Sequence, residues 1–179
     1  MLSRRRFVAA SAVLLALPTA PMAYATRLPD PGAVRALIGL PGIGGPPLSA
    51  DDIENRPVLV TFWASWCPPC RDEFVHFNHI HALYADKGLQ VVGVNVHEDF
   101  GGRSSPEQRA RFIEQTAPAF RLVEGNAGLL ETFGDVQGIP AVFLFDGSGE
   151  VTFLFVAQDG PTPTHATYGD LRPALERLF

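Results

Sequence analysis

The chain has 179 residues, of which 46% are hydrophobic and 10% aromatic, so it can bury one sizeable core but is short for two domains. Only 18% of the residues are charged and the net charge is -5, which excludes an intrinsically disordered protein. The acidic balance argues against nucleic acid or an anionic membrane as a partner, since both require a basic surface. Two cysteines are too few for a disulfide scaffold or a four-thiolate metal site, but they can form one redox pair.

The first 25 residues have the features of an export signal. A basic segment with three arginines, Ser3–Phe7, precedes an apolar run, Val8–Leu17, that is too short to span a bilayer comfortably. The small residues of Ala23–Ala25 then match a signal peptidase site. The order Ser-Arg-Arg-x-Phe resembles the twin-arginine signal, which exports folded proteins, and a Sec signal is the alternative. We therefore expect a periplasmic protein, with a retained N-terminal anchor as the alternative to cleavage.

Residues 26–57 form a segment that is rich in proline and glycine, which interrupt regular elements. We expect an extended lead-in that lies over the following domain, with at most one short helical turn near Val34–Ile38. A regular pattern of apolar residues begins only at Val58. This change of pattern places the folded domain at residues 58–179.

A strand, a helix and a second strand are predicted in succession at the start of this domain. The continuous apolar run Val58–Trp63 is typical of a strand buried on both faces. Apolar residues then recur at helical spacing from Cys70 to Ala85, and Leu89–Val96 returns to β-branched strand character. Because a crossover of this kind is right-handed, the two strands should lie parallel in one sheet.

The remaining predicted elements are shorter. Pro106 suits the first position of a helix that starts after Ser105 and runs to about Thr116. Two apolar runs bracket the turn sequence Asp146–Gly149 and indicate a β-hairpin. The other predicted elements are a strand at Phe120–Val123, a short helix at Leu129–Phe133, the hairpin strands Val142–Phe145 and Val151–Val156, and a terminal helix at Gly169–Leu178.

The chemistry of this sequence lies in Trp66-Cys67-Pro68-Pro69-Cys70, at the junction of the first strand and its helix. A helix N-terminus presents free N–H groups and the positive end of the helix dipole, which together stabilise a thiolate. Cys67 precedes the first turn and is therefore the predicted nucleophile. Cys70 lies one turn into the helix and is the predicted resolving thiol, which attacks the mixed disulfide formed at Cys67. Trp66, as an exposed apolar side chain, is predicted to bind protein substrates together with Pro68 and Pro69.

At these residues the sequence resembles the thioredoxin superfamily, and within it the exported TlpA, ResA and DsbE group of thiol-disulfide oxidoreductases. The resemblance runs from about Val58 to Phe155 and rests on the motif Phe62–Cys70 and on the later Gly138-Ile139-Pro140. It implies an α/β, thioredoxin-like fold with a central mixed sheet and helices on both faces. It also implies that Pro140 is cis and lies beside the disulfide, where the main chain of Ile139 pairs with a substrate strand.

Glu73 matches a glutamate that the ResA branch of this group places near its cysteines. If burial raises its pKa toward neutrality, the carboxyl group can carry protons to or from Cys70. The alternative is an ordinary acid in the first helical turn that stabilises the helix dipole. Two positions depart from the resemblance: Thr61 stands where thioredoxin has a buried aspartate, and Val75 stands where many relatives have a helix-kinking proline.

Two classes of function fit these residues. The first is an exported disulfide reductase that exchanges thiols with exported proteins through Cys67 and Cys70. In the group that the sequence resembles, the substrate is often apocytochrome c, and a membrane-embedded partner must supply the electrons. The second is a thioredoxin-fold copper chaperone that binds the metal through both cysteines and a histidine. The cysteines are separated by two residues, both proline, which favours the reductase over the copper chaperone. For the reductase we expect no cofactor, no metal and a monomeric protein.

Other polar residues have simpler interpretations. His76, His79 and His81 lie on the first predicted helix, but no carboxylate completes an obvious metal site, so a solvated or half-buried histidine face is favoured. The run His97–Asp99 at the end of the second predicted strand is interpreted as a polar loop. The alternative for this run is a part in the rim of the active site.

Overall fold

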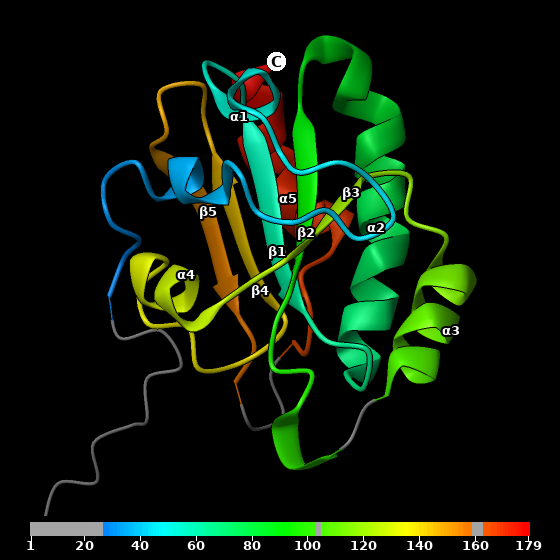
Figure 1. Ribbon diagram of the computed structural model, residues 1–179. Helices are drawn as coiled ribbons and strands as arrows, with labels where there is room; N and C mark the ends of the chain where they lie inside the picture. The colour runs from blue at the N-terminus through cyan, green and yellow to red at the C-terminus, as the bar shows by residue number, and fades with distance from the viewer. Residues whose placement is uncertain (1–26, 103–104, 159–162) are drawn as a thin grey trace, which may run out of the picture.

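The computed structural model describes residues 27–102, 105–158 and 163–179, so the predicted signal at residues 1–25 lies outside the described part of the chain. Five strands form one mixed sheet in the order β3-β2-β1-β4-β5 (Figure 1). Helices pack on both faces of this sheet. The architecture is the one that the resemblance implied.

The central strands are apolar along their whole length. Every residue of β1 and β4 is buried, as expected for strands covered on both faces. β1 pairs in parallel with β2 and antiparallel with β4, which confirms the parallel pairing predicted for the first two strands. The predicted hairpin is formed by β4 and β5. The strands are β1 (Val58–Trp63), β2 (Gln90–Asn95), β3 (Arg121–Glu124), β4 (Ala141–Phe145) and β5 (Val151–Val156).

The helices divide between two layers of core. Alternate residues of β1 point to opposite faces: Leu59 and Trp63 join the core beneath α2, α3 and α5, whereas Val60 and Phe62 join the core beneath η1, α1 and α4. The α-helices are α1 (Ala50–Ile53), α2 (Pro68–Tyr84), α3 (Pro106–Thr116), α4 (Ala127–Thr132) and α5 (Tyr168–Leu178), and the 3-10 helices are η1 (Ala33–Leu37), η2 (Ala85–Lys87) and η3 (Phe100–Gly102).

The lead-in contains more structure than the sequence predicted. The short turn expected near Val34 is η1, but α1 was not expected. α1 starts with a capping box, in which Ser49 and Asp52 satisfy each other's backbone N–H groups. Gly42 also forms an isolated antiparallel bridge with Val123 of β3. Six apolar residues of the lead-in are buried in the core with the sheet: Ala33, Val34, Leu37, Leu40, Leu48 and Ile53.

Helix α2 begins two residues earlier than the apolar spacing predicted, and this shift places the cysteine motif on the helix end. Cys67 is the N-cap residue and Pro68 takes the first helical position. Proline is favoured there because its fixed φ suits a helix and the N–H that it lacks would have no helical partner. The N-terminal end of α2 therefore lies at the carboxyl end of β1, with Cys67 directly before its first turn and Cys70 within that turn.

Candidate active site

Cys67 and Cys70 form a disulfide at the N-terminus of α2, with their Cα atoms 5.4 Å apart. The backbone N–H of Cys70 donates a hydrogen bond to Sγ of Cys67 at 3.2 Å. Because Pro68 and Pro69 have no N–H, this is the first amide that the helix can offer to the sulfur. Cys67 keeps 3% of its surface exposed, whereas Cys70 is fully covered. Of the two cysteines, Cys67 is thus the one that an incoming thiol or disulfide can reach.

Glu73 lies one turn beyond Cys70, on the same side of α2, and is fully buried. The Thr61 hydroxyl donates to Oε2 of Glu73 at 2.6 Å, and the backbone N–H of Ala166 donates to Oε1 at 3.2 Å. Burial disfavours the carboxylate more strongly than these bonds favour it, and it raises the pKa of Glu73 from 4.5 to about 8. At neutral pH this side chain therefore holds a proton within the core that contains Cys70.

The second predicted motif has the expected backbone form. The Ile139-Pro140 peptide bond is cis, as the resemblance implied. Pro140 is buried, and Ile139 is half-buried and packs against both layers of core. Pro68, at the other motif, is exposed, and Pro69 is half-buried.

Trp66 corrects one expectation, because it is half-buried rather than exposed. Its indole Nε1 donates to the backbone carbonyl of His97 at 2.8 Å, and its ring stacks on Phe100 with the ring centroids 5.5 Å apart. Both partners lie in the loop that follows β2. Trp63, by contrast, is a core residue that stacks on Phe112 of α3 at 4.7 Å.

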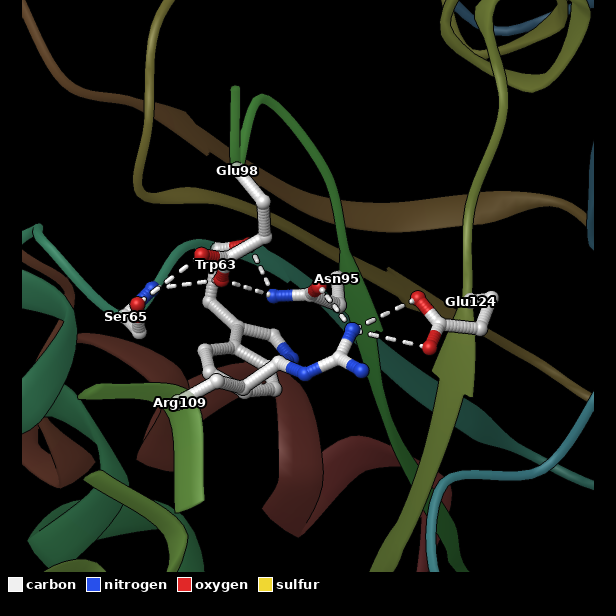
Figure 2. Close-up of polar contacts among 6 residues, drawn as sticks. All are labelled: Trp63, Ser65, Asn95, Glu98, Arg109 and Glu124. Carbon is white, nitrogen blue, oxygen red and sulfur yellow. Dashed lines mark hydrogen bonds and ion pairs between the residues drawn. The ribbon is translucent and has the colours of Figure 1, made fainter. Parts of the chain in front are cut away.

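The carboxylate of Glu98, which lies in the run interpreted as a polar loop, holds the segment before Cys67 (Figure 2). Oε1 of Glu98 accepts the backbone N–H of Ser65 at 2.7 Å, and Oε2 accepts the Ser65 hydroxyl at 2.8 Å. The Asn95 side-chain amide also donates to Oε1 of Glu98, at 2.6 Å. Of the two interpretations of the run His97–Asp99, a part of the active-site rim is therefore the better one for Glu98. The sequence signal for this role was the position of Glu98 shortly after a parallel strand, whose carboxyl end lies beside that of β1.

Arg109 extends this set of contacts to the neighbouring strand, as Figure 2 shows. The guanidinium group, from α3, donates to Oδ1 of Asn95 at 3.3 Å and to both carboxylate oxygens of Glu124 at 2.8 and 3.1 Å. Asn95 Nδ2 also donates to the Trp63 carbonyl at 3.3 Å. The contacts thus link the ends of β1, β2 and β3 to α3, next to the cysteine motif.

Two histidines of α2, His76 and His79, contact the start of α5 and the segment before it. His76 stacks on His165 with the ring centroids 5.8 Å apart, and His79 meets the ring of Tyr168 edge-on at 5.0 Å. Burial, together with electrostatic repulsion from the neighbouring His165 ring, lowers the pKa of His76. Within residues 27–102, 105–158 and 163–179, no three His, Cys, Asp or Glu side chains are grouped to hold a metal ion. The copper alternative therefore gains no support.

The fold and the disulfide define a thioredoxin-like protein with a Cys-Pro-Pro-Cys motif at the start of the long helix α2. The chain belongs to the Redoxin family, which it matches over residues 33–171. No helix in the described part of the chain has both the length and the apolar character needed to cross a membrane.

Individual relatives carry related names. Over 114 residues the chain is 25% identical to the thiol-disulfide oxidoreductase ResA of Halalkalibacterium halodurans, covering 63% of this chain and 60% of the relative. Over 100 residues it is 33% identical to the thiol:disulfide interchange protein DsbE of Yersinia pestis, covering 56% and 48%. The chain thus spans about half to three-fifths of these curated relatives. The crystal structure of StoA from Bacillus subtilis superposes with a TM-score of 0.60 at 23% identity, covering 80% of this chain and 98% of that chain, and shows the same fold.

Proposed function

We propose that the protein is an exported thiol-disulfide oxidoreductase that reduces disulfides of exported proteins through the Cys67-Cys70 pair. The observation that carries this proposal is the position of Cys67 as the N-cap of α2, where the Cys70 amide donates to its sulfur. A thiolate at this position is stabilised by the same amide and by the helix dipole. The relatives named ResA and DsbE support the assignment of the reaction class.

The reaction exchanges two electrons between the protein and its substrate. The Cys67 thiolate attacks a substrate disulfide, forms a mixed disulfide and releases the first substrate thiolate, which takes up a proton. The Cys70 thiolate then attacks Sγ of Cys67 and releases the second substrate thiol. The protein finishes with the Cys67-Cys70 disulfide and the substrate is reduced. The proton that Cys70 loses goes to the leaving substrate sulfur. We assign to Glu73, which already holds a proton at neutral pH, the donation of that proton to the Cys70 sulfur when the disulfide is reduced again.

The substrate meets this site beside the cis proline. We assign the main chain of Ile139 to pairing with an extended substrate segment, with Trp66, Pro68, Pro69 and Pro140 around it. Apocytochrome c is the candidate substrate that the DsbE and ResA resemblance favours. Because an exported compartment is oxidising, repeated turnover requires a reductant, for which a membrane-embedded electron donor is the proposed partner.

The reduction potential of the pair tests the direction of the reaction. Pro68 and Pro69 withhold two amides from the Cys67 sulfur, so its thiolate should be only moderately stabilised. Strong oxidants of this fold owe their potential to a very stable thiolate. We therefore expect a Cys67 pKa between about 3.5 and 8.5, and a potential clearly more negative than about -120 mV. Equilibration with a glutathione series, followed by thiol trapping, measures the potential.

Pro69→Ala provides a matched variant for this measurement. It adds an N–H at the second helical position, close to the capping sulfur, and should shift the potential to a less negative value.

The wild-type protein should also catalyse the reduction of insulin disulfides by dithiothreitol. A wild-type potential near -120 mV would identify an oxidant and contradict the reductase assignment.

A further inference from the structure

An exposed aromatic ring stacks on the residue that directly precedes the reactive cysteine. Phe100, in η3, is 58% exposed, and its ring stacks on Trp66 at 5.5 Å between centroids with an angle of 27° between the planes. Trp66 directly precedes Cys67 in the chain. The two stacked rings form what we call the aromatic pair, an apolar surface that begins at the residue beside the nucleophile. Exposed apolar surfaces of this kind commonly mark a binding site.

The aromatic pair is held in place relative to the cysteines. Nε1 of Trp66 donates to the His97 carbonyl at 2.8 Å, which fixes the indole against the loop after β2. One residue earlier in the chain, Ser65 is held by two hydrogen bonds to the Glu98 carboxylate (Figure 2). The loop that carries Phe100 and the loop that carries Cys67 are therefore joined at two successive positions. A surface that is fixed in advance loses little side-chain freedom when a ligand binds.

We propose that the aromatic pair is a specificity element, which selects substrates that carry an apolar side chain next to their reactive cysteine. This inference rests on the proposed function, since it assigns the specificity of the same site. The occupant follows from position: a polypeptide whose cysteine reaches Sγ of Cys67 must bring its neighbouring residues over Trp66 and Phe100. Aromatic rings bind apolar side chains by burying their surface, whereas a small polar side chain gains little from that contact.

Two peptide disulfides test the proposal in a single turnover. Each is the disulfide-linked dimer of a seven-residue peptide with one cysteine, flanked by leucine in one peptide and by serine in the other. The reduced protein becomes the Cys67-Cys70 disulfide and each dimer releases two peptide thiols, so thiol release measures the rate. We expect the wild type to react about tenfold faster with the leucine peptide, which is a typical effect of one contact residue.

Phe100→Ala should reduce this preference to near unity by slowing the leucine peptide alone, and Phe100→Tyr should retain it. Phe179→Ala is the matched control, because Phe179 is also an exposed phenylalanine but lies at the opposite end of the molecule (Figure 1). The control variant should keep the wild-type preference. The reduction potential of Phe100→Ala should equal that of the wild type, which a general disturbance of the active site would change.

Three results would overturn the inference without contradicting the proposed function. The first is an undiminished preference in Phe100→Ala, and the second is an equal slowing of both peptides with a changed potential. The third is equal wild-type rates with the two peptides, which would remove the specificity while leaving the proposed function intact. If neither peptide disulfide reacts with the reduced wild type, the proposed function itself is wrong, and the inference fails with it.

Discussion

Cys67→Ser should reduce the catalysis of insulin reduction to the rate measured without the protein, because a serine hydroxyl does not attack disulfides at neutral pH. Cys70→Ser should instead accumulate substrate proteins bound to Cys67. It retains the accessible nucleophile, Cys67, but lacks the thiol that resolves the mixed disulfide. Insulin turbidity measures the first effect. Non-reducing electrophoresis and mass spectrometry of the captured adducts measure the second.

The two serine variants control for each other. Both lack the same disulfide, so both lose whatever stability it contributes, and any difference between them reflects the roles of the two sulfurs. Cys70 is fully covered in the oxidised protein, whereas Cys67 is partly accessible. Adducts that form on Cys70 in the Cys67→Ser variant, with none on Cys67 in the Cys70→Ser variant, would reverse the assignment.

Glu73→Gln should remove a large pH dependence from the stability of the oxidised protein. The carboxyl group has an ordinary pKa of 4.5, which burial raises to about 8 in the folded state. Between these values the folded state holds a proton that the unfolded state has lost, so the free energy of unfolding falls as the pH rises. The part of the stability that depends on the Glu73 proton is fully present below pH 4.5 and is lost as the pH approaches 8. The loss is on the order of 4 kcal/mol.

Chemical denaturation of the wild type and Glu73→Gln between pH 4 and 9 measures this difference. The amide should follow the wild type at low pH and become the more stable variant near pH 8. Glu114→Gln neutralises an exposed acid on α3 and should keep the wild-type pH dependence. Parallel curves for all three proteins would show that Glu73 carries no buried proton and would remove the basis for its role in proton transfer.

Local sequence patterns predicted most of the sheet and the place of the disulfide. The apolar run at β1, the helical spacing of α2 and the turn between β4 and β5 each depend on residues that are close in the chain, so one sequence contains the signal. The same is true of the helix that starts after Ser105, whose side chain caps it by accepting from the Gln108 N–H.

The contacts around the site could not be predicted in this way. Glu73 depends on the Ala166 amide, 93 residues away, and Ser65 depends on Glu98, 33 residues away. Such pairings follow from how the strands assemble. Thr61 was noted only because it stands where thioredoxin has a buried aspartate, although its hydroxyl donates to the carboxyl group of Glu73. In the lead-in, the spacing of Ser49 and Asp52 was an available signal for α1, but the density of prolines and glycines obscured it.

The bridge at Gly42 covers one edge of the sheet. β3 is the outermost strand on its side of the sheet, and an uncovered edge strand can pair with the edge of another molecule. The Ile43 N–H donates to the Leu122 carbonyl and the Glu124 N–H donates to the Pro41 carbonyl, both at 2.9 Å. Three backbone positions of the proline- and glycine-rich segment therefore shield β3 from intermolecular strand addition. A recombinant version trimmed at residue 57 would expose this edge and become prone to self-association.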